Sequence, residues 1–228
     1  MGTISARDYG VVFDGFQAPI SKIVNCGAKC APYNNGTPVC CDAGHAIPIV
    51  DKTEYAHLKT RTKMWKPFVP RTPDQKAEIA DLKGSENCAV ECNGAEFCER
   101  DNRSLACRSF PFFPYFDKKE LVGLATYWNF EGLCWVIHNL TIVEKPFIDQ
   151  FLKIHEFIFK KDDNWRVTYV DHSAVMRQVY SRRGDKFAVI MRDGTYRWVL
   201  PKSGGKMVPA TKKELLSLRS GFTLPNQE

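Results

Sequence analysis

The sequence predicts an α+β protein in which a small irregular cysteine-rich module is braced by helices and a β-hairpin. Eight of the nine cysteines lie between residues 26 and 107, on segments rich in the turn-forming residues Gly, Pro and Asn. After Cys134, a helical apolar stripe and an Asp193-Gly194 dipeptide between two apolar runs indicate regular structure. We therefore expect two regions, residues 1–135 and residues 136–228, and leave open whether they share one core.

The sequence of residues 1–135 predicts only short helices and strands. Its three prolines between residues 66 and 73 favour an extended segment there, and Asp51 or Thr53 is typical of a helix N-cap. The expected elements are an edge strand over 46–50, a helix over 53–59, an extended segment over 66–73, a helix or turn over 73–83 that ends at Gly84, and strands over 120–128 and 133–137.

The second region gives clearer periodic signals. Apolar residues recur at helical spacing from Phe147 to Phe159, and Pro146 suits the first turn of that helix. A second helix is expected from Asp171 or Ser173 to Arg183, closed by Gly184. The Asp193-Gly194 pair predicts a type I′ hairpin turn between strands over 186–192 and 195–200. A capping box at residues 211–214 predicts a helix through Leu218 that stops at Gly221.

Composition excludes several classes of protein. The 228 residues are 44% hydrophobic and 25% charged, as in ordinary globular chains. The longest apolar runs are far shorter than the ~20 residues that a membrane-spanning helix needs, and residues 1–10 lack the apolar core of a secretory signal. The net charge is +6 without any block of Lys and Arg. We therefore expect a cytoplasmic protein that binds neither membrane nor nucleic acid.

The cysteines fall into two groups of four. The first is Cys26-x3-Cys30-x9-Cys40-Cys41, and the second is Cys88-x3-Cys92-x5-Cys98-x8-Cys107. A zinc site needs four ligands at about 2.3 Å, and a cubane iron–sulfur cluster needs four thiolates in a larger cage. All eight are therefore candidate metal ligands. The spacing leaves open whether each group forms its own site or the groups share sites.

Metal binding is favoured over disulfides because the number of cysteines is odd and a reducing compartment is expected, although disulfides remain the alternative. The tight CxxC pairs of most zinc fingers are missing, which favours an iron–sulfur cluster, preferably [4Fe–4S], over zinc.

The segments Cys26-Gly-Ala-Lys-Cys30 and Cys40-Cys41-Asp-Ala-Gly-His resemble the zinc- or iron-chelating family of CxxCxxCC proteins. The run from Cys98 to Phe112, in which Cys107-Arg108 leads into Phe110-Pro111, resembles the closing element of that family. The resemblance covers about residues 24–116 and implies that these cysteines bind a metal or a cluster. Some relatives are linked to lysine N-methylation of flagellin, which implies S-adenosylmethionine as methyl donor.

This chain departs from the family in two ways. The spacing from Cys30 to Cys40 is longer than the usual one, and no glycine-rich nucleotide loop follows a strand, so the sequence does not support the methylase role.

Other residues add candidate roles. We expect Arg108 to neutralise a metal–thiolate centre, and the aromatic run over 110–116 to shield that centre from water. His45 is interpreted as a loop residue with ligation as the alternative, and Cys134 as a buried core thiol. We expect His155 to lie in the core and Asp171-His172-Ser173 to begin a helix rather than form a catalytic triad.

These observations predict a metal-binding protein with a cysteine-ligated iron–sulfur cluster and a redox or modification role. The alternatives are a zinc-binding structural or interaction protein with a protein partner and, less favoured, an S-adenosylmethionine-dependent protein N-methylase. The sequence assigns neither a reaction nor a catalytic residue.

Overall fold

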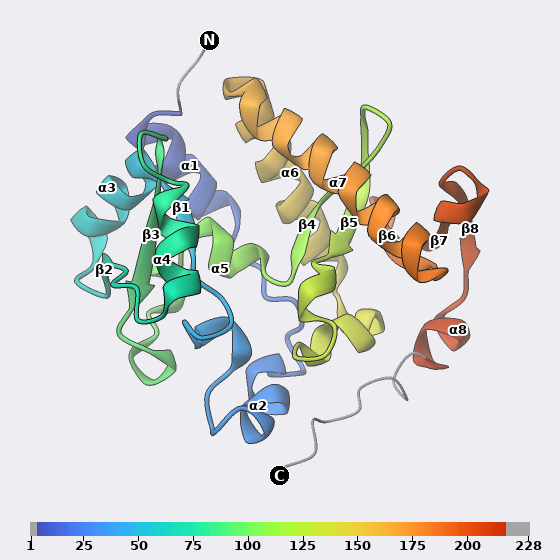
Figure 1. Ribbon diagram of the computed structural model, residues 1–228, viewed down its shortest axis with the longest axis horizontal. Helices are drawn as coiled ribbons and strands as arrows, with labels where there is room; N and C mark the ends of the chain where they lie inside the picture. Colours follow the sequence, from blue (N-terminus) through green and yellow to red (C-terminus); the bar gives the residue numbers. More distant parts are fainter. Residues whose placement is uncertain (1–3, 218–228) are drawn as a thin grey trace.

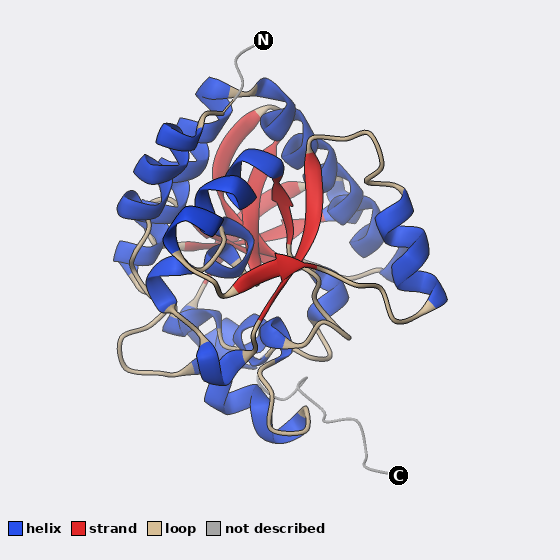
Figure 2. Cartoon of the chain, turned by 90° about the vertical axis from the view of Figure 1, so that its left-hand side faces the viewer, coloured by secondary structure: helices blue, strands red, loops and turns tan. Residues whose placement is uncertain are grey.

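The computed structural model describes residues 4–217, in which helices surround two antiparallel sheets (Figures 1 and 2). Of the described residues, 50% are helical and 19% lie in strands, so the predicted α+β class is confirmed. The helices are α1 Ala6–Gly15, α2 Cys26–Cys30, α3 Lys52–Arg61, α4 Pro73–Ala80, α5 Leu105–Ser109, α6 Lys145–Lys161, α7 Asp163–Arg183 and α8 Lys212–Ser217.

The two sheets differ in size and position along the chain. The smaller has the order β1-β3-β2, with β1 Ile49–Asp51, β2 Trp65–Pro67 and β3 Asn87–Cys92. The larger has the order β4-β5-β6-β7-β8, with β4 Phe112–Asp117, β5 Glu120–Thr126, β6 Phe187–Met191, β7 Tyr196–Leu200 and β8 Lys206–Ala210. Short 3₁₀ turns connect many of these elements, most of them in the cysteine-rich part of the chain and just after β5.

The core draws on both halves of the chain. Helix α7 packs against β4, and α6 contacts α7 and β5. Phe16 from the N-terminal part contacts Phe147 and Phe151 of α6, with ring centroids 5.4 and 6.0 Å apart. Strands from both sides of residue 135 join in the larger sheet through the β5–β6 pairing. The division into regions 1–135 and 136–228 stays a prediction.

Local sequence signals place several helices correctly. Helix α6 carries the predicted apolar stripe, with Pro146 in its first turn. Helix α3 begins after Asp51, whose Oδ1 accepts hydrogen bonds from the backbone N of Thr53 and Glu54 at 2.7 and 3.3 Å. Helix α7 ends at Gly184, which has a φ of 81°. A left-handed C-cap of this kind suits glycine because it has no Cβ.

Helix α7 starts earlier than expected. It begins at Asp163, where the Asp162 carboxylate accepts a hydrogen bond from Asn164 N at 2.9 Å, and not at Asp171 or Ser173. The first two turns have no continuous apolar stripe, so periodicity did not reveal them. The Asp171-His172-Ser173 segment therefore lies inside a helix instead of capping one.

The hairpin is present, but its turn is not type I′. Met191 N donates to Thr195 O at 2.8 Å, so residues 192–194 form a three-residue connection. Gly194 has a φ of 84°, whereas Asp193 is not among the residues with positive φ. A turn closed by a glycine in the left-handed region is the usual solution for a loop of this length.

The predicted strand over 133–137 is wrong. Residues Trp135–His138 form a 3₁₀ helix, and Cys134 N donates to Phe130 O at 2.8 Å. Val136 and Ile137 are both buried, which a strand with alternating faces does not allow when one face is exposed. Leu218 and Gly221, expected at the end of the last helix, lie outside the described residues.

Elements α1, α2, β3, α5, β4 and β8 were not predicted from the sequence. A capping box between Ser5 and Asp8 caps the N-terminus of α1. The aromatic run over 110–116 contributes most of β4. No helix within residues 4–217 combines the length and apolar character needed to cross a bilayer.

Candidate metal centre

A cavity of about 790 Å³ lies beside α2, the end of β3 and α5, and it collects most of the cysteines. The thiol-bearing residues on its wall are Cys26, Cys40, Cys41, Cys92, Cys98 and Cys107. Basic residues on the same wall are Lys22, Lys66, Arg71, Arg100, Arg103 and Arg108, whereas Glu91 is its one acidic residue. Positive surroundings of this kind favour ionised thiols.

The first group of thiols comes from a tight loop after α2. Cys40 and Cys41 lie in a 3₁₀ turn, and their Sγ atoms are 4.0 Å apart. The sulfur contact lowers the pKa of Cys41 and raises that of Cys40, because a Cys40 thiol that donates to Cys41 favours the Cys41 thiolate. Asn34 Nδ2 donates to the Asp42 carboxylate at 3.1 Å, which holds the loop closed.

The second group comes from the end of β3 and from α5. Cys92 ends β3 opposite Trp65 of β2, and Gly94 follows with a φ of 102° that lets the chain turn toward Cys98. Ser104 caps α5 by accepting a hydrogen bond from Cys107 N at 3.2 Å. The cap orients the start of the helix, so Cys107 faces the same cavity as Cys92.

Burial raises the pKa of several of these thiols. It raises the pKa of Cys107 to about 12, with electrostatic contributions from Cys92 and Cys41. Burial also raises the pKa of Cys92, and neighbouring Cys41 and Cys98 add to that effect. These thiols are therefore close enough to influence each other's ionisation, and a bound cation would stabilise their thiolate forms.

Arg103 is the basic residue in closest contact with the thiols. Its Nε donates to Cys98 Sγ at 3.0 Å. The guanidinium also acts to lower the pKa of Cys41, after the contact from Cys40. Arg103 was not predicted as a site residue. Its position in the sequence, between Cys98 and Cys107, was a signal that its side chain lies near these thiols.

Arg108 lines the cavity but donates to backbone carbonyls. Its partners are Arg103 O at 2.9 Å, Asp101 O at 2.6 Å, Phe13 O at 3.3 Å and Phe16 O. Its guanidinium also lies over the Phe13 ring, 5.0 Å from the centroid. Burial lowers the pKa of Arg108 to about 10. The observed contacts fasten α5 to α1, and the charge-neutralising role stays a prediction.

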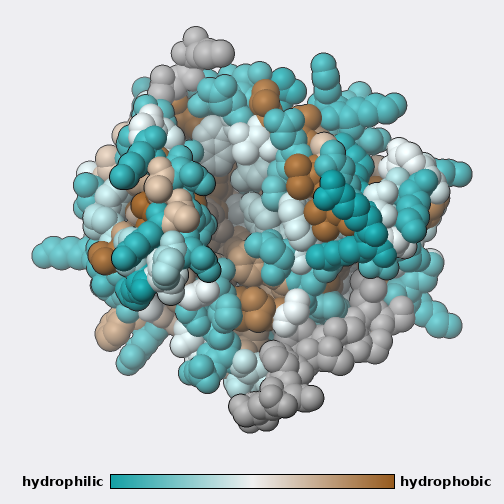
Figure 3. Space-filling view, in the orientation of Figure 1, coloured by the Kyte–Doolittle hydropathy of each residue, from teal (hydrophilic) through white to brown (hydrophobic). Residues whose placement is uncertain are grey.

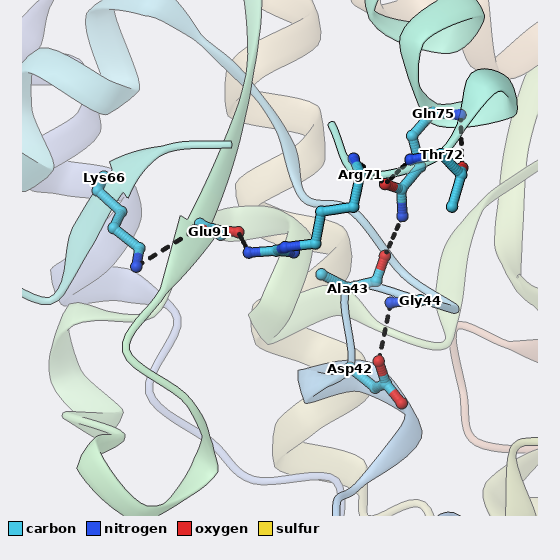
Figure 4. Close-up of polar contacts among 8 residues, drawn as sticks. All are labelled: Asp42, Ala43, Gly44, Lys66, Arg71, Thr72, Gln75 and Glu91. Atoms are coloured by element: carbon cyan, nitrogen blue, oxygen red, sulfur yellow. Dashed lines mark hydrogen bonds and ion pairs between the residues drawn. The ribbon is translucent and has the colours of Figure 1, made fainter. Parts of the chain in front are cut away.

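A hydrogen-bonded bridge joins the two thiol-bearing segments (Figure 4). Glu91, next to Cys92, pairs with Lys66 at 3.2 Å and with Arg71 at 2.8 Å. Gln75 of α4 accepts from Arg71 N at 2.7 Å and donates from Nε2 to Ala43 O at 3.2 Å. Ala43 follows the Cys40–Cys41 pair, so α4 connects the Cys41 loop to the end of β3.

Three cysteines lie elsewhere. Cys30 is buried, with Sγ 3.6 Å from Gly27 O. Cys88 sits on the β1 side of β3, opposite Val50. Cys134 is 6% exposed, and burial raises its pKa to about 12, as expected for a core thiol. Cys30 and Cys88 were predicted as candidate ligands, and neither lines the cavity that the other six share.

Three of the histidines have hydrogen-bond partners away from the thiols. His45 Nε2 contacts Asn34 Oδ1 at 2.9 Å, and His138 Nε2 contacts Glu131 O at 2.6 Å. His155 is 1% exposed and contacts Phe151 O at 2.8 Å, in the core as predicted. Ser173 Oγ donates to Tyr169 O at 2.7 Å, within its own helix.

The chemistry of the donors fits a thiophilic metal, because six thiols surround one cavity. Among residues 4–217, however, no three His, Cys, Asp or Glu side chains are already arranged to hold a metal ion. Loading would therefore draw several thiols closer together. Phe110, from the aromatic run, also lines this cavity.

Comparison of the chain with protein-family models, with curated proteins and with solved structures finds no match.

Proposed function

We propose that this chain binds a metal centre through cysteine thiolates, and that the centre is a [4Fe–4S] cluster in preference to zinc. The observation that carries the proposal is the gathering of six cysteines from two distant segments on one cavity wall, beside Arg103. Such a centre supplies electron transfer or activation chemistry when it is bound. The proposed role is therefore redox chemistry or participation in a modification reaction.

The proposed ligands are Cys41, Cys92, Cys98 and Cys107. Cys92 interacts electrostatically with Cys41 and Cys98, and Cys107 does so with Cys92 and Cys41. Cys40 Sγ lies 4.0 Å from Cys41 Sγ, and Cys26 faces the same cavity from α2. Arg103, already within hydrogen-bond distance of Cys98, would offset part of the negative charge of the four thiolates.

The choice between cluster and zinc follows from the spacing of the sulfurs. Four thiolates at about 2.3 Å from one zinc ion must approach each other closely, whereas a cubane cluster holds them farther apart. No three thiols within residues 4–217 are already drawn together around an ion-sized site. Binding a cubane cluster therefore needs a smaller rearrangement of this loop-rich wall than binding a single zinc ion does.

The proposal is tested by anaerobic purification followed by measurement of iron, acid-labile sulfide and zinc. We expect iron and sulfide in the native protein, and a loss of most of both in Cys107→Ser, because one of four ligands is removed. Cys88→Ser is the matched control, since Cys88 lies on the same strand as Cys92 but outside the cavity.

Equal iron in Cys107→Ser and native protein would remove Cys107 from the ligand set. Stoichiometric zinc without iron, lost in Cys107→Ser, would replace the cluster by the structural zinc site and move the search from reactions to protein partners. Neither metal in the anaerobic protein would overturn the proposed function.

A further inference from the structure

A second cavity, of about 870 Å³, opens on the other side of Cys40 and Cys107. Figure 3 shows the surface hollowed between the part of the molecule that carries α4 and the part that carries α7. The walls of the cavity come from β1, α3, α5, the turn after β5 and the first half of α7. Its volume is in the range of small-molecule sites.

The charges on this wall have one sign. Asp51, Glu54, Glu78, Glu86 and Asp162 line the cavity, and no Lys or Arg does so among the described residues. Two of these carboxylates also cap helices, Asp51 at α3 and Asp162 at α7. The chain as a whole carries a net charge of +6, so a wall without any basic residue is a local reversal. Its field favours a cation.

The apolar part of the wall is aromatic. Trp128 stacks on His172 with ring centroids 4.8 Å apart and an interplanar angle of 24°. Trp165 and Tyr169 of α7 line the same space. Aromatic faces attract organic cations, and Trp does so most strongly.

Two polar atoms on this wall lack hydrogen-bond partners. Ser109 is 7% exposed, and its buried Oγ has no partner among the described residues. His172 Nε2 is buried and has no partner within residues 4–217 either. Buried polar atoms are usually paired, so both atoms indicate a group that reaches them from the cavity. Burial lowers the pKa of His172 to about 4, and the neutral ring offers an acceptor at Nε2 in the tautomer that carries its proton on Nδ1.

Glu54 is the buried carboxyl group of the site. It is 1% exposed and forms no ion pair with any residue of the described chain. Its Oε1 accepts a hydrogen bond from Leu105 N at 2.6 Å. Burial disfavours the ionised form of Glu54, and a bound cation would favour it.

We infer that this cavity binds a small aliphatic amine as its ammonium ion, with the charged end toward Glu54 and the faces of Trp128 and Trp165. Three independent features lead to the ammonium: acidic groups without basic ones, aromatic faces, and unpaired buried acceptors. A divalent ion ligated directly by side chains fits less well, because no three acidic or other ligating side chains of the described residues converge here. The inference does not depend on the metal centre.

The test is calorimetric titration of the full-length protein, purified anaerobically, with n-butylammonium chloride at constant ionic strength. We expect saturable binding with a Kd of about 1 mM or tighter, and no binding of 1-butanol or sodium butyrate. Glu54→Gln should weaken butylammonium binding at least about tenfold. Trp165→Leu should weaken it about threefold or more, because one aromatic face is lost.

Glu156→Gln is the matched control, because Glu156 pairs with Arg192 on the exposed side of α6. It should leave the affinity unchanged. If Glu54→Gln fails to fold, Trp165→Leu carries the test, since Trp165 lies near the surface of α7. Equal affinity for butyrate, tighter binding of Mg²⁺ than of butylammonium, or equal loss in Glu156→Gln would each overturn the inference. Iron content is measured on every variant. It distinguishes a failure of the inferred amine site from a failure of the proposed metal centre.

Discussion

At the scale of single residues, Glu54 is the group that couples stability to pH most directly. Burial raises its pKa from 4.5 to about 8, with the hydrogen bond from Leu105 opposing that shift. Between these two values the folded state binds the proton more tightly than the unfolded state. The contribution to stability is therefore fully present below pH 4.5 and is lost as the pH rises through about 8.

We predict that Glu54→Gln gains stability relative to the native protein as the pH rises through this window. The difference in free energy of unfolding should grow by up to about 1.4 kcal/mol per pH unit, because the amide cannot ionise. Urea unfolding at several pH values measures it. Glu78→Gln, at an exposed position of α4, should show no such trend. A difference for Glu54→Gln that is independent of pH would contradict the assignment of this buried proton.

At the scale of elements, the cap of α4 holds the Cys40–Cys41 loop in place. Thr72 and Gln75 form a capping box, and Gln75 reaches Ala43. Thr72→Ala should cost about 1 kcal/mol and should speed amide hydrogen exchange over residues 40–46. Thr211→Ala removes the equivalent threonine from the cap of α8 and should leave exchange in that loop unchanged. Equal exchange in both variants would show that α4 does not restrain the loop.

The close contact between β5 and β6 depends on Gly123, which has no Cβ. A Cβ on Gly123 would lie 2.1 Å from Ile190 O, and the β6 backbone cannot retreat because it also pairs with β7. Gly123→Ala should therefore destabilise the fold by more than about 2 kcal/mol in thermal or urea unfolding. Gly132→Ala, with nothing within 4 Å of the added atom, should stay within about 0.5 kcal/mol. A mild effect at Gly123 would mean that the strands are not in contact there.

At the scale of the whole molecule, aromatic packing joins the side that carries the thiol cavity to the side that carries α6 and α7. Phe151 of α6 is fully buried and contacts Phe16, whose neighbours line the thiol cavity. Phe151→Ala should cost about 3–5 kcal/mol because it leaves a cavity in this shared core. Tryptophan fluorescence and thiol labelling should then report the same lowered urea midpoint. Val167→Ala, at a 44% exposed position, is the control. Separate midpoints for the two probes would show that the two sides unfold independently.

The sequence by itself determined the features that depend on neighbouring residues. The stripe of α6, the Asp51 cap of α3 and the Gly184 end of α7 follow from spacing and backbone conformation within a few residues. The same local information predicts that the cysteines carry the chemistry, and this stays a prediction. It failed at Trp135–His138, where the chain forms a 3₁₀ turn instead of a strand, and at the start of α7, whose first turns have no continuous apolar stripe.

Only the tertiary structure decided which thiols share a cavity. Cys88 and Cys92 lie on one strand, yet only Cys92 lines the cavity. Arg103 donates a hydrogen bond to a thiol there, although the sequence pointed only to Arg108. The acidic aromatic cavity likewise joins α3 to α7, more than a hundred residues apart. Spacing along the chain specifies helices and turns because their hydrogen bonds are local, whereas a site lined by distant segments is fixed by the packing that brings those segments together.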